Sequence, residues 1–476
     1  MTIQYIHMKS IFTVLFAIIG LSIYGQYDID FELKNYEGDT IIIGNYYADR
    51  QLVRDTLAGG NGTFQYEGKD TIQPGVYFVL LPEDNNFMQF FVDGVDNEFE
   101  MRWDVKAGSD ISFKGTKDNE AFAKYMKFLS KKRPEADTYR ARLTAADSTG
   151  VKDEEAKAQL DKVDQDVKAK QKEIVAEMPG SVSARFIKSS FQVDIPEYEG
   201  DDAQLKTYKF YKKHYFDNVD LGDSVNLRTP YLHQRVDYYL EKLTPQDPDS
   251  IMVSIDYLLS EMEPAHETWK YYLSYFLNKY AKLKIVGYDA VYVHLIDKYY
   301  ASGKAYWVSE ENLTKMKDQA DKFRNILIGE KFPDITTYKA DSLKTPVRVW
   351  DVDSEYTILL FWAHDCGHCT KSMPAIVEFY EEYESKGVTL ISICTKGGKK
   401  TKPCIEAVPE KNMDKFINTF DEYQRYRQIV AIPSTPKIFI LDKDKNILIK
   451  DIPSKELKMI MPEIIKIDQM KKVDKM

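Results

Sequence analysis

The strongest constraint on the fold comes from two apolar runs, YTILLFW (356–362) and VTLISIC (388–394), separated by a helical pattern that ends at Gly387. Runs this apolar are typical of parallel strands buried on both faces of a sheet. The segment between them carries apolar residues at helical spacing, with glycine in the position that favours a helix end. The sequence therefore predicts a β-α-β unit. KIFIL (437–441), ILIK (447–450) and a last helix predict a hairpin and a helix that complete the domain.

The four cysteines of the chain cluster at this unit. Cys366 and Cys369 directly follow the first predicted strand. Haem attachment requires a histidine after the second cysteine, where Thr370 stands. Structural zinc requires four ligands, and the spacing of Cys394 and Cys404 is poor for a second pair. A purely structural disulfide between Cys366 and Cys369, which are only three residues apart, would stabilise the fold little. The pattern therefore favours thiol–disulfide exchange, and we expect no metal and no cofactor.

The position of the pair predicts a different role for each thiol. Free N–H groups and the helix dipole at a helix N-terminus favour a thiolate at Cys366, which we expect to be the exposed nucleophile. Cys369 lies one turn into the helix. It is placed to attack the mixed disulfide and release the product.

At these residues the C-terminal part resembles the thioredoxin superfamily, and most closely its exported TlpA/ResA-like thiol–disulfide oxidoreductases. The resemblance implies that the last proline of the motif, Pro436, follows a cis peptide bond beside the cysteines, with Pro433 as the other candidate. Such a proline would leave the backbone of Thr435 free to pair with an extended substrate. The positions that carry the resemblance are the strand end at Phe361, Trp362 and Ala363, the Cys366-Gly367-His368-Cys369 motif, Pro374, and Ser434, Thr435 and Pro436.

The chain departs from the family pattern at two positions. Asp365 stands where a tryptophan usually precedes the first cysteine, and Leu360 replaces the buried acid of cytosolic thioredoxins. His368 resembles the residue between the cysteines of protein disulfide isomerase. Asp365 would raise the pKa of Cys366, whereas His368 and the helix end would lower it. The net direction, and with it the choice between reductase, oxidant and isomerase, stays open at this point.

Cys394 and Cys404 allow three interpretations. They form a static disulfide, they remain two free thiols, or they relay electrons to the Cys366–Cys369 pair. Cys394 ends the second apolar strand. Because a β-α-β crossover makes the two strands parallel, Cys394 is expected at the same edge of the sheet as Cys366. Because free thiols rarely persist in an oxidising compartment, we predict a Cys394–Cys404 disulfide.

The N-terminus predicts export. Lys9 precedes a short apolar run (11–24) and small residues, after which the sequence becomes polar. This is the pattern of a secretory signal peptide, predicted here over 1–25, with Met8 as an alternative start. An uncleaved anchor helix is the alternative, but the run is shorter than the ~20 residues that span a bilayer. We therefore expect a periplasmic or cell-envelope protein.

Composition and length limit the class of partner and the number of domains. The net charge of −10, with both signs interspersed, argues against a nucleic-acid partner. Four cysteines are too few for a disulfide scaffold, so each domain needs its own apolar core. The chain length suggests about three domains. The histidines of the middle region show no metal-ligand spacing; they are His214, His233, His266 and His294.

Two further domains are predicted before the cysteine-bearing one. Residues 26–116 alternate apolar and polar residues between turn signals, which predicts an antiparallel β-sandwich or a small barrel. Residues 117–326 carry amphipathic helical patterns, for example over 151–178. The thioredoxin-like domain then occupies 327–476, so the predicted fold class is multidomain: β-sandwich, all-α, and α/β.

The resulting functional prediction is an exported enzyme that exchanges disulfides with envelope proteins. The resemblance suggests a reductive direction, maintained by a membrane electron donor as partner. The alternative is a non-catalytic interaction protein whose β and helical domains bind partners. Peroxidase activity is disfavoured because no Thr-x-x-Cys pattern precedes a lone cysteine.

Overall fold

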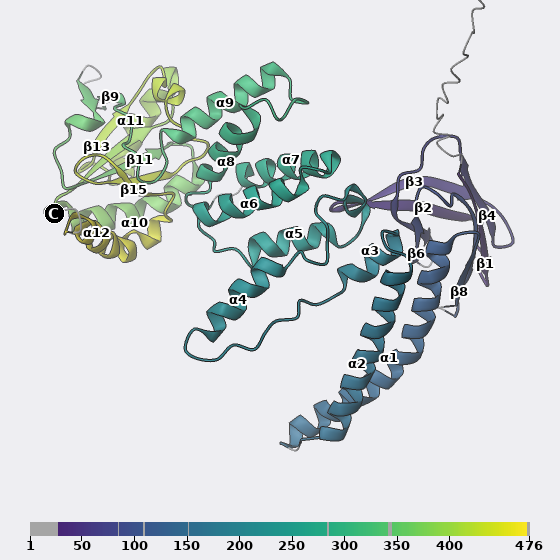
Figure 1. Ribbon diagram of the computed structural model, residues 1–476. Helices are drawn as coiled ribbons and strands as arrows, with labels where there is room; N and C mark the ends of the chain where they lie inside the picture. The colour runs from purple at the N-terminus through teal and green to yellow at the C-terminus, as the bar shows by residue number, and fades with distance from the viewer. Residues whose placement is uncertain are drawn as a thin grey trace, which may run out of the picture. The chain divides into compact units, whose positions relative to one another are not determined.

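The protein is described by a computed structural model that covers residues 27–83, 85–107, 110–150, 152–282, 285–340 and 345–473. The predicted signal peptide lies outside these residues. The chain divides into two compact units between Arg235 and Val236. This division falls inside the predicted helical domain, 117–326, and each unit is described by itself (Figure 1).

The first unit begins with two four-stranded sheets whose inner faces share one apolar core. Alternate residues of the first strand, Ile29, Phe31 and Leu33, point into this core, as the period of two predicts. One sheet has the order β4-β1-β7-β8 and the other β3-β2-β5-β6. The strands are β1 (Tyr27–Lys34), β2 (Thr40–Tyr47), β3 (Arg50–Ala58), β4 (Thr63–Gly68), β5 (Gly75–Leu81), β6 (Asn86–Val92), β7 (Glu98–Asp104) and β8 (Ile111–Lys114).

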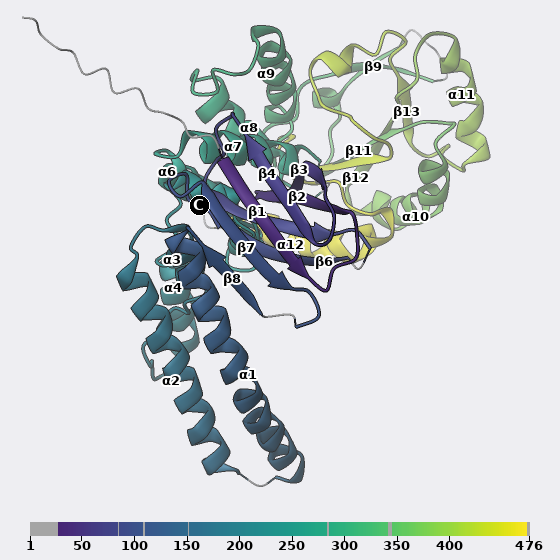
Figure 2. The same cartoon turned by 90° about the vertical axis from the view of Figure 1, so that its right-hand side faces the viewer.

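The predicted antiparallel sandwich is confirmed, with one difference in pairing. β1 and β7 are parallel, and all other strand pairs of the two sheets are antiparallel. Figure 2 shows β1 and β7 side by side. A parallel pair needs a long connection. Here the chain supplies it by building five strands, β2 to β6, between β1 and β7.

Four helices follow in the first unit, as the amphipathic patterns predict. A long hairpin of two helices extends from the sheets in Figures 1 and 2. Thr116 caps the first of them by accepting a hydrogen bond from the N–H of Asn119. Ala156, Val163 and Ile174 form the buried stripe of the second. The helices are α1 (Lys117–Thr149), α2 (Glu154–Glu177), α3 (Val182–Ser189) and α4 (Ala203–His214).

The second unit starts with helices and ends with an α/β domain. Its helical part is rich in aromatic residues, and many of them are core residues; Trp269, Tyr272 and Phe276, for example, are buried. The helices are α5 (Leu232–Glu241), which begins before the division, α6 (Pro248–Met262), α7 (His266–Lys282), α8 (Asp289–Leu295) with a π-helical extension (Ile296–Tyr300), and α9 (Glu310–Arg324).

The α/β domain is built on a seven-stranded mixed sheet of order β10-β9-β13-β12-β11-β14-β15. The central strands β11 and β12 are parallel, as predicted from the β-α-β unit. The first strand of the predicted hairpin, β14, pairs with the other side of β11 and is antiparallel to it. The strands are β9 (Thr336–Lys339), β10 (Pro346–Arg348), β11 (Tyr356–Trp362), β12 (Val388–Cys394), β13 (Ile417–Phe420), β14 (Lys437–Leu441) and β15 (Ile447–Lys450). The helices are α10 (Gly367–Tyr383), α11 (Thr401–Glu410) and α12 (Leu457–Val473).

Both faces of this sheet are covered, which explains the continuous apolar runs. Ile358, Leu360 and Trp362 of β11 pack in the same core as α10, α11 and α12. The alternate residues, Leu359 and Phe361, lie in a second core with Phe332 and Tyr426 on the other face. Every residue of β11 is buried, and the strand ends at the edge where α10 begins.

A buried ion pair connects this domain to the helices of the second unit. Lys450, at the end of β15, is 1% exposed and donates to Asp289 of α8 and to the carbonyl oxygen of Ile326. Burial lowers the pKa of Lys450, while the carboxylate of Asp289 opposes that change. Breaking one side of such a pair is costly because it leaves a buried charge without a partner. The helices α8 and α9 and the thioredoxin-like sheet therefore depend on each other.

Candidate active site

Cys366 occupies the N-cap position of α10, directly after the loop that leaves β11. Its sulfur accepts a hydrogen bond from the N–H of Cys369 at 3.2 Å, and its thiol donates to the carbonyl oxygen of Thr435 at 3.4 Å. The side chain is half-buried, so the sulfur is accessible. Burial alone would raise the pKa of Cys366. Hydrogen bonds from Cys369, Thr435 and the backbone at the start of the helix outweigh burial, and the pKa lies below its ordinary value.

Cys369 differs from Cys366 both in exposure and in pKa. It is completely buried and packs in the core beneath α10. Burial and the hydrogen bond to Cys366 raise its pKa to about 11. Because the thiolate is the nucleophile, the geometry divides the two roles. Cys366 is suited to attack an external disulfide, and Cys369 to act inside the protein.

The loop before β14 forms the other side of the site. The Thr435–Pro436 peptide bond is cis, at the position that the resemblance indicated, whereas the alternative, Pro433, is not preceded by a cis bond. Thr435 and Pro436 are half-buried. The Cys366 contact to the Thr435 carbonyl oxygen brings this loop against the nucleophile although the two are 69 residues apart.

The charge of Asp365 is compensated. Its carboxylate pairs with Lys396 at 2.9 Å, and this hydrogen bond holds the pKa of Asp365 below its usual range. Sequence reasoning identified the aspartate beside the nucleophile but missed Lys396. The lysine lies two residues beyond β12, so its proximity follows from the parallel pairing of Trp362 with Cys394.

The remaining predicted neighbours surround the cysteines. Gly367 and His368 are exposed on the first turn of α10, and the backbone N–H of His368 contributes to the lowered pKa of Cys366. A Cβ added to Gly367 would meet no described atom within 4 Å, so this side of the site is open. Trp362 is 1% exposed and belongs to the core, and its carbonyl oxygen accepts a hydrogen bond from the N–H of Thr395.

Cys394 and Cys404 are joined in a disulfide across ten residues, with Cα atoms 6.4 Å apart. Both are 2% exposed, and the bridge ties α11 to the end of β12 at the edge that carries the active site. Nδ1 of His364 lies 3.5 Å from the sulfur of Cys404. His364 thus reaches the second cysteine pair from the loop that leads to Cys366.

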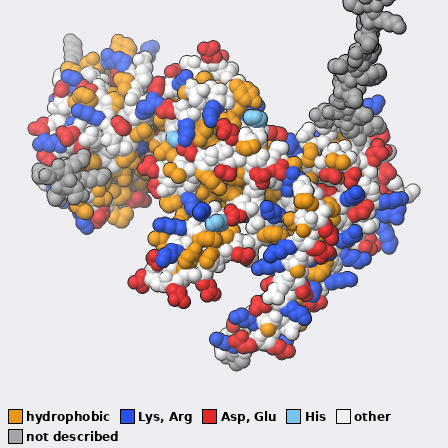
Figure 3. Space-filling model, in the orientation of Figure 1, with side chains coloured by type: hydrophobic (Ala, Val, Ile, Leu, Met, Phe, Trp, Pro, Cys, Tyr) orange, Lys and Arg blue, Asp and Glu red, His pale blue; other side chains and the backbone are white. Residues whose placement is uncertain are grey.

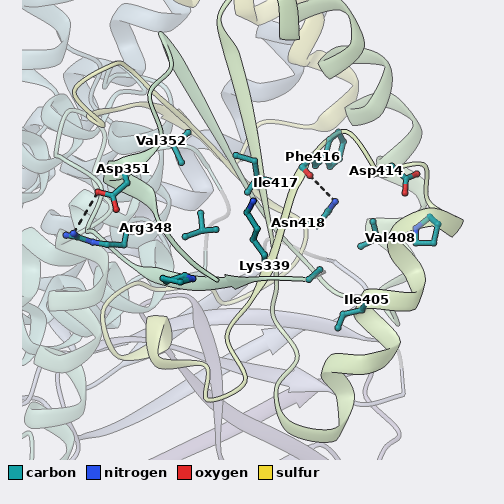
Figure 4. Close-up of a pocket in the computed structure, with 14 residues that line it drawn as sticks. Lys339, Arg348, Asp351, Val352, Ile405, Val408, Asp414, Phe416, Ile417 and Asn418 are labelled. Carbon is teal, nitrogen blue, oxygen red and sulfur yellow. Dashed lines mark hydrogen bonds and ion pairs between the residues drawn. The ribbon is translucent and has the colours of Figure 1, made fainter. Parts of the chain in front are cut away.

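A separate cavity lies in the α/β domain. A cavity of about 540 Å³ opens beside β9, β10 and α11 (Figure 4), and it is lined by residues such as Lys339, Arg348 and Phe416. None of the predicted site residues lines it. Within the described part of the chain, no cluster of three histidine, cysteine or acidic residues could hold a metal ion. In the same residues, no helix has both the length and the hydropathy needed to cross a membrane.

The surface charge agrees with the composition. Figure 3 shows lysine, arginine and acidic side chains interspersed over the visible face.

Three segments of the chain match known protein families. Residues 328–449 match the AhpC/TSA family. Residues 27–122 match a domain of unknown function, DUF4369, and residues 154–325 match another, DUF5106.

The similar proteins of known name match less than a third of this chain. "Thiol-disulfide oxidoreductase ResA" of Bacillus thuringiensis (strain Al Hakam) is 26% identical over 129 residues, which are 27% of this chain and 71% of that protein. The protein of the same name from Bacillus cereus (strain ZK / E33L) is 26% identical over 133 residues, 28% of this chain and 73% of its own length.

A solved structure, that of a thioredoxin-like protein from Bacteroides caccae, covers 57% of this chain and 97% of its own. It has 17% sequence identity and a TM-score of 0.46. With the AhpC/TSA match, the relatives named ResA and the strand order described above, the C-terminal domain of this chain is a thioredoxin-like domain of the thiol–disulfide oxidoreductase type.

Proposed function

We propose that this chain is an exported oxidoreductase that reduces disulfides in cell-envelope proteins through Cys366 and Cys369. The observation that carries the proposal is the contrast between the two thiols. Cys366 is accessible and has a lowered pKa, whereas Cys369 is buried and has a pKa of about 11. This asymmetry is what a two-step exchange requires.

The proposed reaction is a thiol–disulfide exchange in two steps. The Cys366 thiolate attacks one sulfur of a client disulfide, forms a mixed disulfide and releases the other client sulfur as a thiolate. Cys369 then attacks the sulfur of Cys366, and its proton passes to the departing client sulfur. The second client thiol leaves, and the domain keeps a Cys366–Cys369 disulfide. An external dithiol donor must return two electrons and two protons, and we propose a membrane-bound protein dithiol for this role.

Trapping clients tests the proposal directly. A Cys369→Ser variant should accumulate mixed disulfides through Cys366, whereas Cys366→Ser should form none and should lose disulfide reduction. The experiment uses envelope extracts of cells that express the full chain, followed by nonreducing gels and mass mapping. If Cys369→Ser captures no protein, or if capture occurs through Cys394 or Cys404, the proposed site is wrong.

The direction and the compartment need separate measurements. Equilibration with a dithiothreitol buffer gives the reduction potential of the pair, and a reductase predicts a value near about −270 mV and far from the −120 mV of a strong oxidant. Export predicts that a mature form lacking about 25 residues is found in the envelope fraction. Unprocessed chain in the cytosol would contradict export but not the thiol chemistry.

A further inference from the structure

A cavity of about 420 Å³ lies within the second unit, next to the active-site loop. The loop side is formed by Pro433, Ser434 and Pro436, and Ser372 of α10 also lines the cavity. Thr435, between two of these residues, is the residue whose carbonyl oxygen contacts Cys366. The cavity therefore lies beside the loop that contacts the cysteine where a client disulfide would be attacked.

The opposite wall comes from the helical part of the second unit. Tyr280 of α7, Tyr292 of α8 and Phe323 of α9 line the cavity, and the rings of Tyr292 and Phe323 meet edge to face at 5.5 Å. Ile285, half exposed, lies on the same side. The buried pair of Lys450 with Asp289 fixes this wall, because Asp289 itself lines the cavity.

Three of the four charged groups of the described lining already have partners. Lys437 donates to both carboxylate oxygens of Asp451, at 2.7 and 2.9 Å, and Asp289 is paired with Lys450. Lys282, which is exposed, is the fourth charged residue of the described lining. An occupant therefore gains chiefly from apolar contact, and the volume falls in the range of about 300–1,000 Å³ typical of ligand sites.

We propose that this cavity is a client-selecting pocket, in which the helices α7, α8 and α9 receive a bulky apolar or aromatic side chain next to the client cysteine. The inference rests on the proposed function and extends it to the substrate class. An extended client segment that lies along the Thr435 loop places alternate side chains on opposite sides. One of them reaches the pocket while the cysteine faces Cys366. Aromatic side chains bury the largest area in such a pocket.

The test compares two symmetric disulfide dimers of short peptides, in which the cysteine is flanked on both sides by Phe or by Ala. The full chain should reduce the Phe peptide about tenfold faster, since burying one such side chain is worth roughly that factor or more. Ala281→Trp fills the mouth of the pocket from an exposed position on α7. It should reduce the preference to below about twofold.

Two controls keep the test sharp. Asn278→Trp, exposed on the same helix but outside the cavity lining, should keep the tenfold preference. All variants should reduce bis(2-hydroxyethyl) disulfide, which has no side chain for the pocket, at the rate of the unmodified chain. Circular dichroism checks folding, and Ile285→Asp, which places a charge on the apolar wall, gives a second route to losing the preference.

The outcomes separate the pocket from the proposed function. Equal rates for both peptides, or a preference that survives both Ala281→Trp and Ile285→Asp, would overturn the pocket while leaving the reductase intact. A chain that reduces neither peptide nor the small disulfide would refute the proposed function itself. A concentration-dependent dimer that Ala281→Trp abolishes would show that a second copy occupies the pocket, and the proposal would then be wrong.

Discussion

Alkylation of the reduced protein should label Cys366 far faster than Cys369. At pH 7 a thiol with a pKa of about 11 is ionised to only about one part in 10⁴. The pKa of Cys366 lies below 9.0, so more than about one part in 100 of it is thiolate. The ratio of reactive species therefore exceeds about 100. A thiolate of lower pKa is also the weaker nucleophile, and this lowers the ratio of the two alkylation rates by a factor of up to about ten.

The expected labelling ratio is thus at least about tenfold, and the burial of Cys369 adds to it. The measurement uses iodoacetamide at pH 7, stopped before one tenth of the protein has reacted, with mass mapping of the two sites. Labelling of Cys366 should rise with pH and reach half of its maximum below pH 9, because the pKa of this thiol is lowered. Urea-unfolded protein is the control, because it should label both thiols alike. Equal labelling in the folded state, or preference for Cys369, would refute the assigned roles.

Three further predictions concern the surroundings of the site. Replacing Cys394 and Cys404 by Ala removes a bridge across ten residues and should lower the free energy of unfolding, measured in urea, by about 2.7 kcal/mol. A loss below about 0.5 kcal/mol would show that the bridge does not restrain the unfolded chain. Lys450→Met should lower the free energy of unfolding by about 3 kcal/mol in the same assay, because it leaves Asp289 buried without its partner. Adding Asp289→Leu should recover most of this loss. A double variant no more stable than Lys450→Met would contradict the role of the pair. Lys396→Ala leaves the carboxylate of Asp365 without its cation, so the pKa of Cys366 rises and its alkylation at pH 7 slows about threefold. Faster alkylation of Cys366 in this variant would contradict the prediction.

The central part of the thioredoxin-like domain was predictable because its strands are buried on both faces. The runs at β11 and β12 are apolar throughout, and the cysteine pair lies where one strand passes into a helix. The strands β9, β10 and β13 were not predicted. They have three or four residues each and mix polar with apolar side chains, so they show no usable period.

The contacts of the site were less predictable than its motif. Lys396 and His364 reach their partners through loops after β12 and β11, and loop geometry leaves no periodic trace in the sequence. The parallel pairing of β1 with β7 was missed for a related reason. Alternation of side chains shows that a strand has one buried face, but it does not show the direction of its neighbour.

The buried Lys450–Asp289 pair also bears on how such chains can be rearranged in evolution. The segment that matches DUF5106 ends at residue 325, just before the thioredoxin-like domain, and a boundary between families is where exchange of modules is usually placed. In this protein that cut would separate Lys450 from Asp289, whereas a cut at Arg235 would run through the DUF5106 segment itself. Helices α8 and α9 and strand β15 should therefore be inherited together. A chain that carries such a thioredoxin-like domain without these helices should have a residue other than lysine at the end of β15.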